Sequence, residues 1–191
     1  IEHGQVLGNP DVVALFSGGL DSLCSVIEQY RSFGRRPLLI SHAPAFHVNP
    51  RQSELRTILS ERFGKQWHFP RVSASINRKK SDAPETTHRT RSFLYGAVGA
   101  IAAHALRLTE VQLADNGVVS LNLPINEQVI GAMATRSTHP KFLRLFNRLL
   151  QAVFPDGPLV LNPLRTRTRA ETLEVLKESG CADLIEETNS C

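Results

Sequence analysis

Apolar and polar positions along the chain follow two alternating patterns. Residues 11–16 (DVVALF) form a short apolar run, rich in β-branched residues, which is typical of a buried strand. The next stretch places Leu20, Leu23 and Ile27 at helical spacing, and Gly34 ends it. The start of the chain therefore predicts a strand, a tight connection and a helix.

The same order repeats along the chain, so the sequence predicts a parallel sheet with crossover helices. Further strands are predicted at 37–41, 67–73, 111–114 and 159–161. Further helices are predicted at 55–63, 93–106, 139–154 and 169–179. The helix at 139–154 is expected to bury one stripe, made of Leu143, Phe146, Leu150 and Val153. We expect an α/β fold: a doubly wound, mainly parallel five-stranded sheet with helices on both faces.

The connection after the first strand has the composition of a phosphate-binding loop, Ser17-Gly18-Gly19-Leu20-Asp21-Ser22. Glycines let backbone N–H groups approach an anion closely, and the following helix presents its positive end to the same place. Ser17 and Ser22 can add hydroxyl donors. Asp21 would repel phosphate, so it is better placed to hold Mg²⁺ or to cap the helix.

A plain strand–turn–helix, with serine and aspartate serving only as caps, is the alternative explanation for this loop. A Gly-Gly turn alone would leave that explanation standing, but here a buried strand, both glycines, the aspartate and both serines coincide. The loop is not a Walker A motif, because no Gly-Lys-Ser/Thr follows, and it lacks the dinucleotide-binding Gly-x-Gly-x-x-Gly pattern. The loop therefore predicts a nucleotide-phosphate site of a type other than these two motifs.

This loop resembles SGGxDS, the signature of the PP-loop, or N-type, ATP pyrophosphatases. The resemblance implies a PP-loop/HUP-like variant of the Rossmann fold, in which the loop holds the pyrophosphate end of ATP. It also implies that the adenine lies near Ser41 and His42, at the end of the second strand. The implied activity is cleavage of ATP between its α and β phosphates, which releases pyrophosphate and leaves an adenylated substrate.

Three further segments resemble the 7-cyano-7-deazaguanine synthases, the QueC family: 89–94 (RTRSFL), 163–171 (PLRTRTRAE) and 188–191 (TNSC). The resemblance implies that Arg169 replaces a phosphate-binding lysine. It also implies that Cys191 begins a four-cysteine zinc cluster whose other ligands lie past this chain. Zinc does not follow from the residues themselves, because no Cys-x-x-Cys is present. We expect one ATP-binding domain over residues 1–191, cut short before that cluster.

Two segments depart from the synthases, 115–124 (DNGVVSLNLP) and 135–140 (TRSTHP). Both resemble the QueC-like proteins of anti-phage systems, with the QatC component of Qat systems the nearest. Asp115 follows a predicted strand, at the end where open α/β sheets bind ligands. We expect Asn116 and Asn122 to face the substrate, with Asp115 beside it or holding the turn. Ordinary Asn-Gly turn chemistry is the alternative.

Several cations lie where a bound anion would stabilise them. Arg89 and Arg91 lie at the start of a predicted helix, which disfavours positive charge, so ATP phosphate and a solvated surface pair are both open. Arg169 opens the last predicted helix, where phosphate contact is favoured over a surface ion pair. Together with Asp21, Arg91 and Arg169 are the candidate catalytic residues. Roles in structure and in the site both remain open for His42, His47 and His139.

An adenylating ligase is the first functional hypothesis. A substrate carboxylate or amide oxygen would attack the α phosphate of ATP, and ammonia or another nucleophile would then displace AMP. The alternatives are a queuosine-pathway synthase, a non-catalytic nucleotide sensor in a defence complex, and a tRNA-modifying PP-loop enzyme. The substitutions at 115–124 lead us to expect poor conversion of free 7-carboxy-7-deazaguanine. Thiolation is disfavoured because no cysteine lies on a convincing catalytic loop.

Composition adds three limits to these hypotheses. The net charge of +4 suits ATP or a nucleic acid, but no aromatic residues interleave with the arginines as a single-strand-binding surface requires. No apolar run approaches the roughly 20 residues of a membrane span. We expect a cytoplasmic protein, with ATP and Mg²⁺ as cofactors and other defence-system proteins as candidate partners. No disulfide framework is expected from the three scattered cysteines, Cys24, Cys181 and Cys191.

Overall fold

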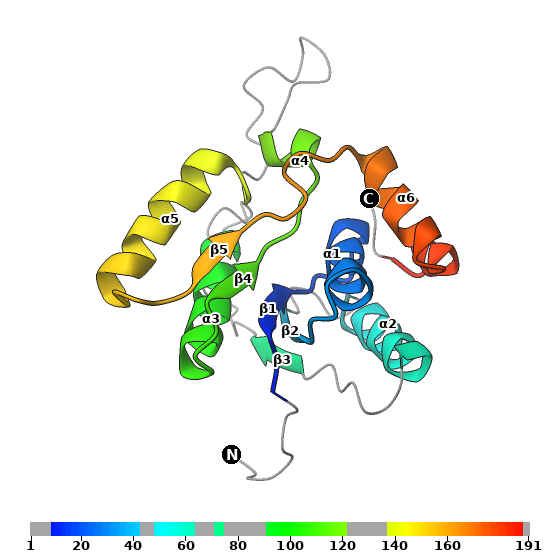
Figure 1. Ribbon diagram of the computed structural model, residues 1–191, viewed down its shortest axis with the longest axis horizontal. Helices are drawn as coiled ribbons and strands as arrows, with labels where there is room; N and C mark the ends of the chain where they lie inside the picture. The colour runs from blue at the N-terminus through cyan, green and yellow to red at the C-terminus, as the bar shows by residue number, and fades with distance from the viewer. Residues whose placement is uncertain (1–8, 43–47, 64–70, 75–90, 122–136, 189–191) are drawn as a thin grey trace, which may run out of the picture.

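The computed structural model describes residues 9–42, 48–63, 71–74, 91–121 and 137–188. Its centre is a five-stranded sheet in the order β3-β2-β1-β4-β5, and every adjacent pair of strands is parallel (Figure 1). The expected α/β class is confirmed. The strands are β1 (Val12–Leu15), β2 (Pro37–His42), β3 (Arg71–Ala74), β4 (Glu110–Gln112) and β5 (Leu159–Leu161).

Helices cover both faces of this sheet, as a doubly wound fold requires (Figure 1). One face carries α1 (Leu20–Arg31), α2 (Val48–Phe63), α6 (Arg169–Glu178) and the short 3-10 helix η2 (Ala182–Ile185). The other face carries α3 (Arg91–Ala105) and α5 (Pro140–Val153). A short helix, α4 (Gly117–Leu121), follows β4 beyond the carboxyl end of the sheet.

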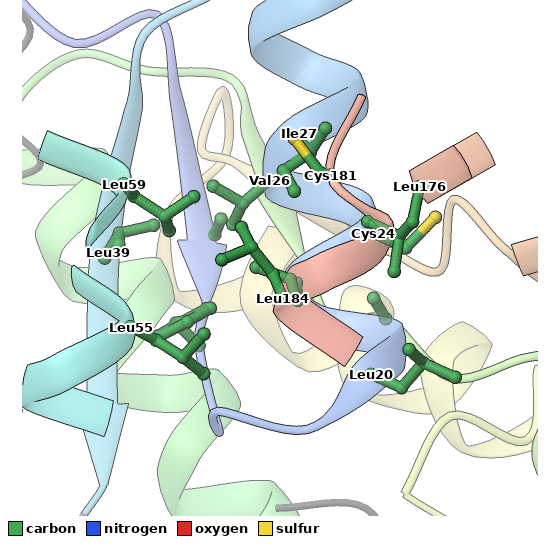
Figure 2. Packing of buried hydrophobic residues seen from close by; sticks show 14 of the residues in the cluster. Leu20, Cys24, Val26, Ile27, Leu39, Leu55, Leu59, Leu176, Cys181 and Leu184 are labelled. Atoms are coloured by element: carbon green, nitrogen blue, oxygen red, sulfur yellow. The ribbon is translucent and has the colours of Figure 1, made fainter. Parts of the chain in front are cut away.

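The central strand β1 is buried on both sides, which explains its unbroken apolar sequence. Ala14 and Phe16 belong to the cluster beneath α1, α2 and α6, part of which Figure 2 shows. Val13 and Leu15 point the other way, into the cluster beneath α3 and α5. Alternate side chains of one strand thus join the two cores, and they fix the position at which β1 delivers the loop that follows it.

Two cysteines lie in the first of these clusters. Cys24 of α1 and Cys181, just before η2, are both fully buried among leucines (Figure 2). Burial raises the pKa of the Cys24 thiol to about 12, so this side chain behaves as a small apolar group.

The predicted buried stripe of α5 is wrong at its last position. Phe146 and Leu150 are buried, but Val153 is 59% exposed. Phe154 ends the helix and stacks its ring on His104 of α3, with ring centroids 4.3 Å apart, and it contributes to the core in place of Val153. At the other end of α5, His139 is the N-cap, where its Nδ1 accepts a hydrogen bond from the Lys141 backbone N–H at 3.1 Å.

Other boundaries differ in smaller ways. The strand expected at 67–73 overlaps β3, while residues 64–70 lie outside the described residues. The Asn-Gly turn signal after β4 leads directly into α4, which the pattern did not predict. Among the described helices, none has the length and apolar character needed to span a membrane.

Candidate functional site

The sheet reverses its winding between β1 and β4. In the order β3-β2-β1-β4-β5, the chain moves outward from β1 in one direction and later returns to the other side of β1 through β4. The connections that leave the carboxyl ends of these two strands therefore turn to opposite faces, which opens the crevice where doubly wound sheets bind ligands. The loop after β1 and the segment Leu113–Asn116 after β4 border this position.

The loop after β1 is closed by its own serines. Gly18 has a φ of +80°, a backbone conformation that favours glycine. The Ser22 hydroxyl donates to the Gly19 carbonyl at 2.8 Å and lies 3.2 Å from the Ser17 hydroxyl. Gly19 is the N-cap of α1, and no side chain of the described residues caps the helix there. The first N–H groups of α1 thus lie beside the crevice, and no side chain in the described part of the chain caps them.

Asp21 joins this loop to the end of β4. Its carboxylate is buried in the first turn of α1, and Oδ2 accepts hydrogen bonds from both the backbone N–H and the side-chain amide of Asn116, each at 2.9 Å. The other oxygen, Oδ1, is buried and has no hydrogen-bond partner among the described residues. Such an oxygen is costly to leave unpaired, and it suits a cation or a ligand that donates a proton.

The oxygen chemistry of Asp21 fits Mg²⁺. Magnesium in nucleotide sites is held by one or two carboxylates together with phosphate oxygens and water. No group of three or more histidine, cysteine or acidic side chains capable of holding a metal occurs in the described part of the chain. Asp21 would therefore hold the ion jointly with the phosphates of the nucleotide, as its Oδ1 allows.

The side chain of Asn116 forms hydrogen bonds within the protein at both ends of its amide. Its amide donates to Asp21, and its Oδ1 accepts from the Val119 backbone N–H at 3.2 Å. The side chain is 2% exposed. These contacts use both ends of the amide, so in this structure Asn116 orients Asp21 and starts α4, and direct contact with substrate stays a prediction.

Asp115 is the second carboxylate of the crevice, and it is partly exposed. Burial raises its pKa to about 6, helped by the nearby negative charge of Asp21 and opposed by hydrogen bonds from Thr138 and Ser137. The Thr138 hydroxyl donates to Asp115 Oδ2 at 2.8 Å, and the Ser137 hydroxyl lies 3.4 Å from the same oxygen. A carboxylate that titrates near neutrality can take up a proton during a reaction.

Two residues that the sequence did not single out hold the backbone around this second carboxylate. Asn162, at the end of β5, donates to the Asp115 carbonyl at 2.7 Å and accepts from its backbone N–H at 3.3 Å. The Gly117 N–H donates to the Arg167 carbonyl at 2.7 Å. The sequence signal for Asn162 was an asparagine directly after a predicted strand. Nothing in the local sequence pattern indicated that the Arg167 carbonyl would accept a hydrogen bond from Gly117.

The β2 side of the site contains two buried polar groups. Ser41, at the end of β2, is 1% exposed, and its hydroxyl is without a hydrogen-bond partner within the described segments. Gln52 of α2, which was also missed, donates from Nε2 to the Ser17 carbonyl at 2.8 Å. Ser41 lies at the strand end where the resemblance places the adenine.

Of the three predicted cations, the structure describes the side chain of Arg169 alone. Arg169 is exposed at the start of α6, after a capping box in which Thr168 and Glu171 bond reciprocally. Arg167 points inward instead and forms an ion pair with Glu28 of α1. Arg89, His47, Asn122 and Cys191 lie outside the described residues, and the structure describes only the backbone of His42 and Arg91.

The titration of Asp115 gives a prediction for stability. Its folded pKa of about 6 lies above the ordinary aspartate pKa of 3.8. The folded state therefore binds the proton more tightly, and the stability contributed by this group is present below about pH 4 and is lost as pH rises through about 6. We expect Asp115→Asn to stabilise the protein by on the order of 2 kcal/mol at about pH 8, since the neutral amide avoids burying a charge.

Urea unfolding at several pH values measures this effect. The gain in unfolding free energy from Asp115→Asn should shrink toward zero at about pH 4, where the wild-type carboxyl is itself neutral. The exposed Asp156→Asn serves as the matched control and should show no such trend. A gain that is equal at both pH values would contradict a raised pKa for Asp115.

Comparisons with known proteins leave the family to be inferred from the site. The chain matches no protein-family model and no curated protein sequence. Among solved structures, it is similar to the U34-tRNA thiolase NcsA from Methanococcus maripaludis with its [4Fe-4S] cluster, at 15% sequence identity and a TM-score of 0.49. The similarity covers 90% of this chain and 58% of that one, so this chain spans little more than half the length of the thiolase.

Proposed function

We propose that this protein is an ATP-dependent adenylating enzyme of the PP-loop ATP pyrophosphatase superfamily. The observation that carries the proposal is the Ser17–Ser22 loop at the β1–β4 reversal, where Oδ1 of Asp21 is buried without a hydrogen-bond partner among the described residues. Its sequence has the PP-loop signature, and its setting between a buried strand and a helix start is the one that binds nucleotide phosphate.

Each group of residues in the site would have a separate role in the reaction. The backbone around Gly18 and Gly19 and the start of α1 would bind the β and γ phosphates, which leave as pyrophosphate. Asp21 would hold Mg²⁺, which neutralises charge on the phosphates when it is bound. Asn116 fixes the carboxylate of Asp21, while Asp115 would accept a proton from the nucleophile that displaces AMP.

The finer identity of the enzyme is also a proposal. The segments 89–94, 163–171 and 188–191 support a QueC-like ligase, and 115–124 and 135–140 support the branch that acts in anti-phage defence. The acceptor would be a carboxylate or amide oxygen on a small molecule or a macromolecule in the cytoplasm. A structural zinc ion with Cys191 as one ligand belongs to the same proposal, and elemental analysis of full-length protein purified without chelator tests it.

Product analysis with ATP, Mg²⁺ and ammonium tests the proposed chemistry. We expect AMP and pyrophosphate in equal amounts, with turnover that depends on an acceptor. ADP and inorganic phosphate would contradict α–β cleavage. Tight ATP binding with no turnover for any acceptor would favour the nucleotide sensor.

Parallel reactions with different acceptors separate the enzymatic alternatives. With free 7-carboxy-7-deazaguanine, mass spectrometry should detect little nitrile, because a site that lacks the ring-reading groups can lose about 10⁴-fold in specificity. Turnover comparable to a true synthase would instead assign the chain to the queuosine pathway. AMP release that requires tRNA would favour a tRNA-modifying enzyme.

A further inference from the structure

The strongest feature outside the crevice is an exposed apolar surface on the helical layer formed by α3 and α5. These helices pack side by side: Phe93 of α3 lies edge-on to Phe146 of α5 at 5.2 Å, and His104 stacks on Phe154 (Figure 1). Five large apolar side chains of this layer are 45–59% exposed. We define them as the α3/α5 face: Phe93, Ile101, Leu145, Leu149 and Val153.

Helical spacing places these five residues on adjoining flanks. On α3, Phe93 and Ile101 are eight residues apart, so Ile101 lies two turns along the same side that meets α5. On α5, Leu149 is three residues after Phe146, and Leu145 and Val153 lie one turn before and after Leu149. Asn147, which bonds to the β5 backbone at Val160, occupies the opposite flank of α5.

The outer surface of α3 lacks the charged side chains that usually solvate an exposed helix. Between Ser92 and Ala105 the helix contains only apolar residues, glycines, one tyrosine and one histidine. A helix that is apolar on nearly all sides normally lies in a protein interior. Exposed apolar surface of this extent on a helical layer is typical of a binding site.

The charges on α5 indicate what covers this surface. Lys141, Arg144 and Arg148 are exposed and border the row of Leu145 and Leu149 by their helical spacing. Neither α3 nor α5 contains an acidic residue, and the first one after α5 is Asp156, beyond its end. A surface of this kind is complementary to an apolar surface rimmed by carboxylates.

We propose that the α3/α5 face docks an acidic, amphipathic helix or helical surface of a partner protein. A second copy of this chain fits less well, because a two-fold contact would bring the cations of both copies together without a carboxylate from either helix. A membrane is the alternative that the vesicle experiment tests. The line of Leu145, Leu149 and Val153 along α5 suits the apolar stripe of one docked helix.

A pair of designed peptides tests the proposal with the full chain. One labelled helical peptide of about 18 residues carries leucines at positions i, i+3/i+4 and i+7 with glutamates along their borders, and the other carries lysines in place of those glutamates. Fluorescence anisotropy should show binding of the glutamate peptide at least about tenfold tighter than of the lysine peptide, with an affinity that falls as salt rises.

Single variants locate the binding to this face. Leu149→Gln and Arg148→Gln should each weaken the glutamate peptide at least about fivefold, because they remove apolar contact and charge. Phe33→Gln is the matched control, since Phe33 is 60% exposed between α1 and β2, and it should change nothing. All three positions are exposed, and circular dichroism checks that each variant folds.

Three outcomes overturn the proposal. The first is equal binding of both peptides, or no binding of the glutamate peptide. The second is a concentration-dependent dimer in sedimentation that Leu149→Gln abolishes, which would assign the face to a second copy. The third is binding to phosphatidylserine vesicles that Leu149→Gln abolishes while neither peptide binds, which would assign it to a membrane. None of these outcomes depends on ATP turnover.

Discussion

Replacing Asp21 by asparagine is expected to lower the rate of AMP and pyrophosphate formation at least about 100-fold, the loss typical of removing one group that stabilises charge in a transition state. The variant keeps the shape of the side chain but removes the negative charge that would hold Mg²⁺. One oxygen can still accept from the Asn116 backbone N–H, so the fold should survive with a loss of about 1 kcal/mol.

The same chemical change at a surface carboxylate is the control for Asp21→Asn. Asp183 is exposed and pairs with Arg62, far from the crevice in the fold, so Asp183→Asn should leave turnover unchanged. Initial rates of pyrophosphate release, measured at saturating ATP for both variants, separate the two positions. If Asp21→Asn retained more than about a tenth of the wild-type rate, Asp21 would be a framework residue only and the Mg²⁺ assignment would fail.

The succession of strands and helices along the chain and the position of the loop could be predicted because their signals are local. An apolar β-branched run followed by Gly18 and Gly19 needs no distant partner to specify a strand and a tight turn. Asp21 and Asp115 could be predicted for the same reason, since each follows a strand at its carboxyl end. Parallel packing then brings these ends together without further information.

The contacts that hold the site together could not be predicted, because each depends on residues far apart in the chain. Asn162 acts on Asp115 from 47 positions away, and Arg167 meets Glu28 from 139 positions away. Arg169 opens α6 as the sequence predicts, directly after the capping box at Thr168, and its contact with phosphate stays a prediction. The turn before α6, in tertiary contact with α1 and α4, brings Arg167 inward.

The replacement of Gly117 by alanine is expected to have the second large effect. A Cβ at this position would lie 2.7 Å from the Arg165 carbonyl oxygen and 3.2 Å from that of Arg167. Both atoms belong to the backbone of the β5–α6 connection and cannot turn aside as a side chain would. That connection must shift away from the end of β4, which also breaks the hydrogen bond from the Gly117 N–H to Arg167.

We expect Gly117→Ala to destabilise the protein by about 2 kcal/mol, the usual scale of overpacking, and to lower the melting temperature by roughly 4–8 °C. Pyrophosphate release should fall at least about tenfold, because Asp115 and Asn116 directly precede Gly117 and Asn116 orients the carboxylate of Asp21. Gly34→Asn is the control: Gly34 has a φ of +62° with nothing within 4 Å of an added Cβ, and asparagine tolerates that conformation. Thermal melts and initial rates of pyrophosphate release, measured for both variants, test this prediction. If Gly117→Ala melted like Gly34→Asn and turned over ATP normally, the β5–α6 connection would have no part in holding the site.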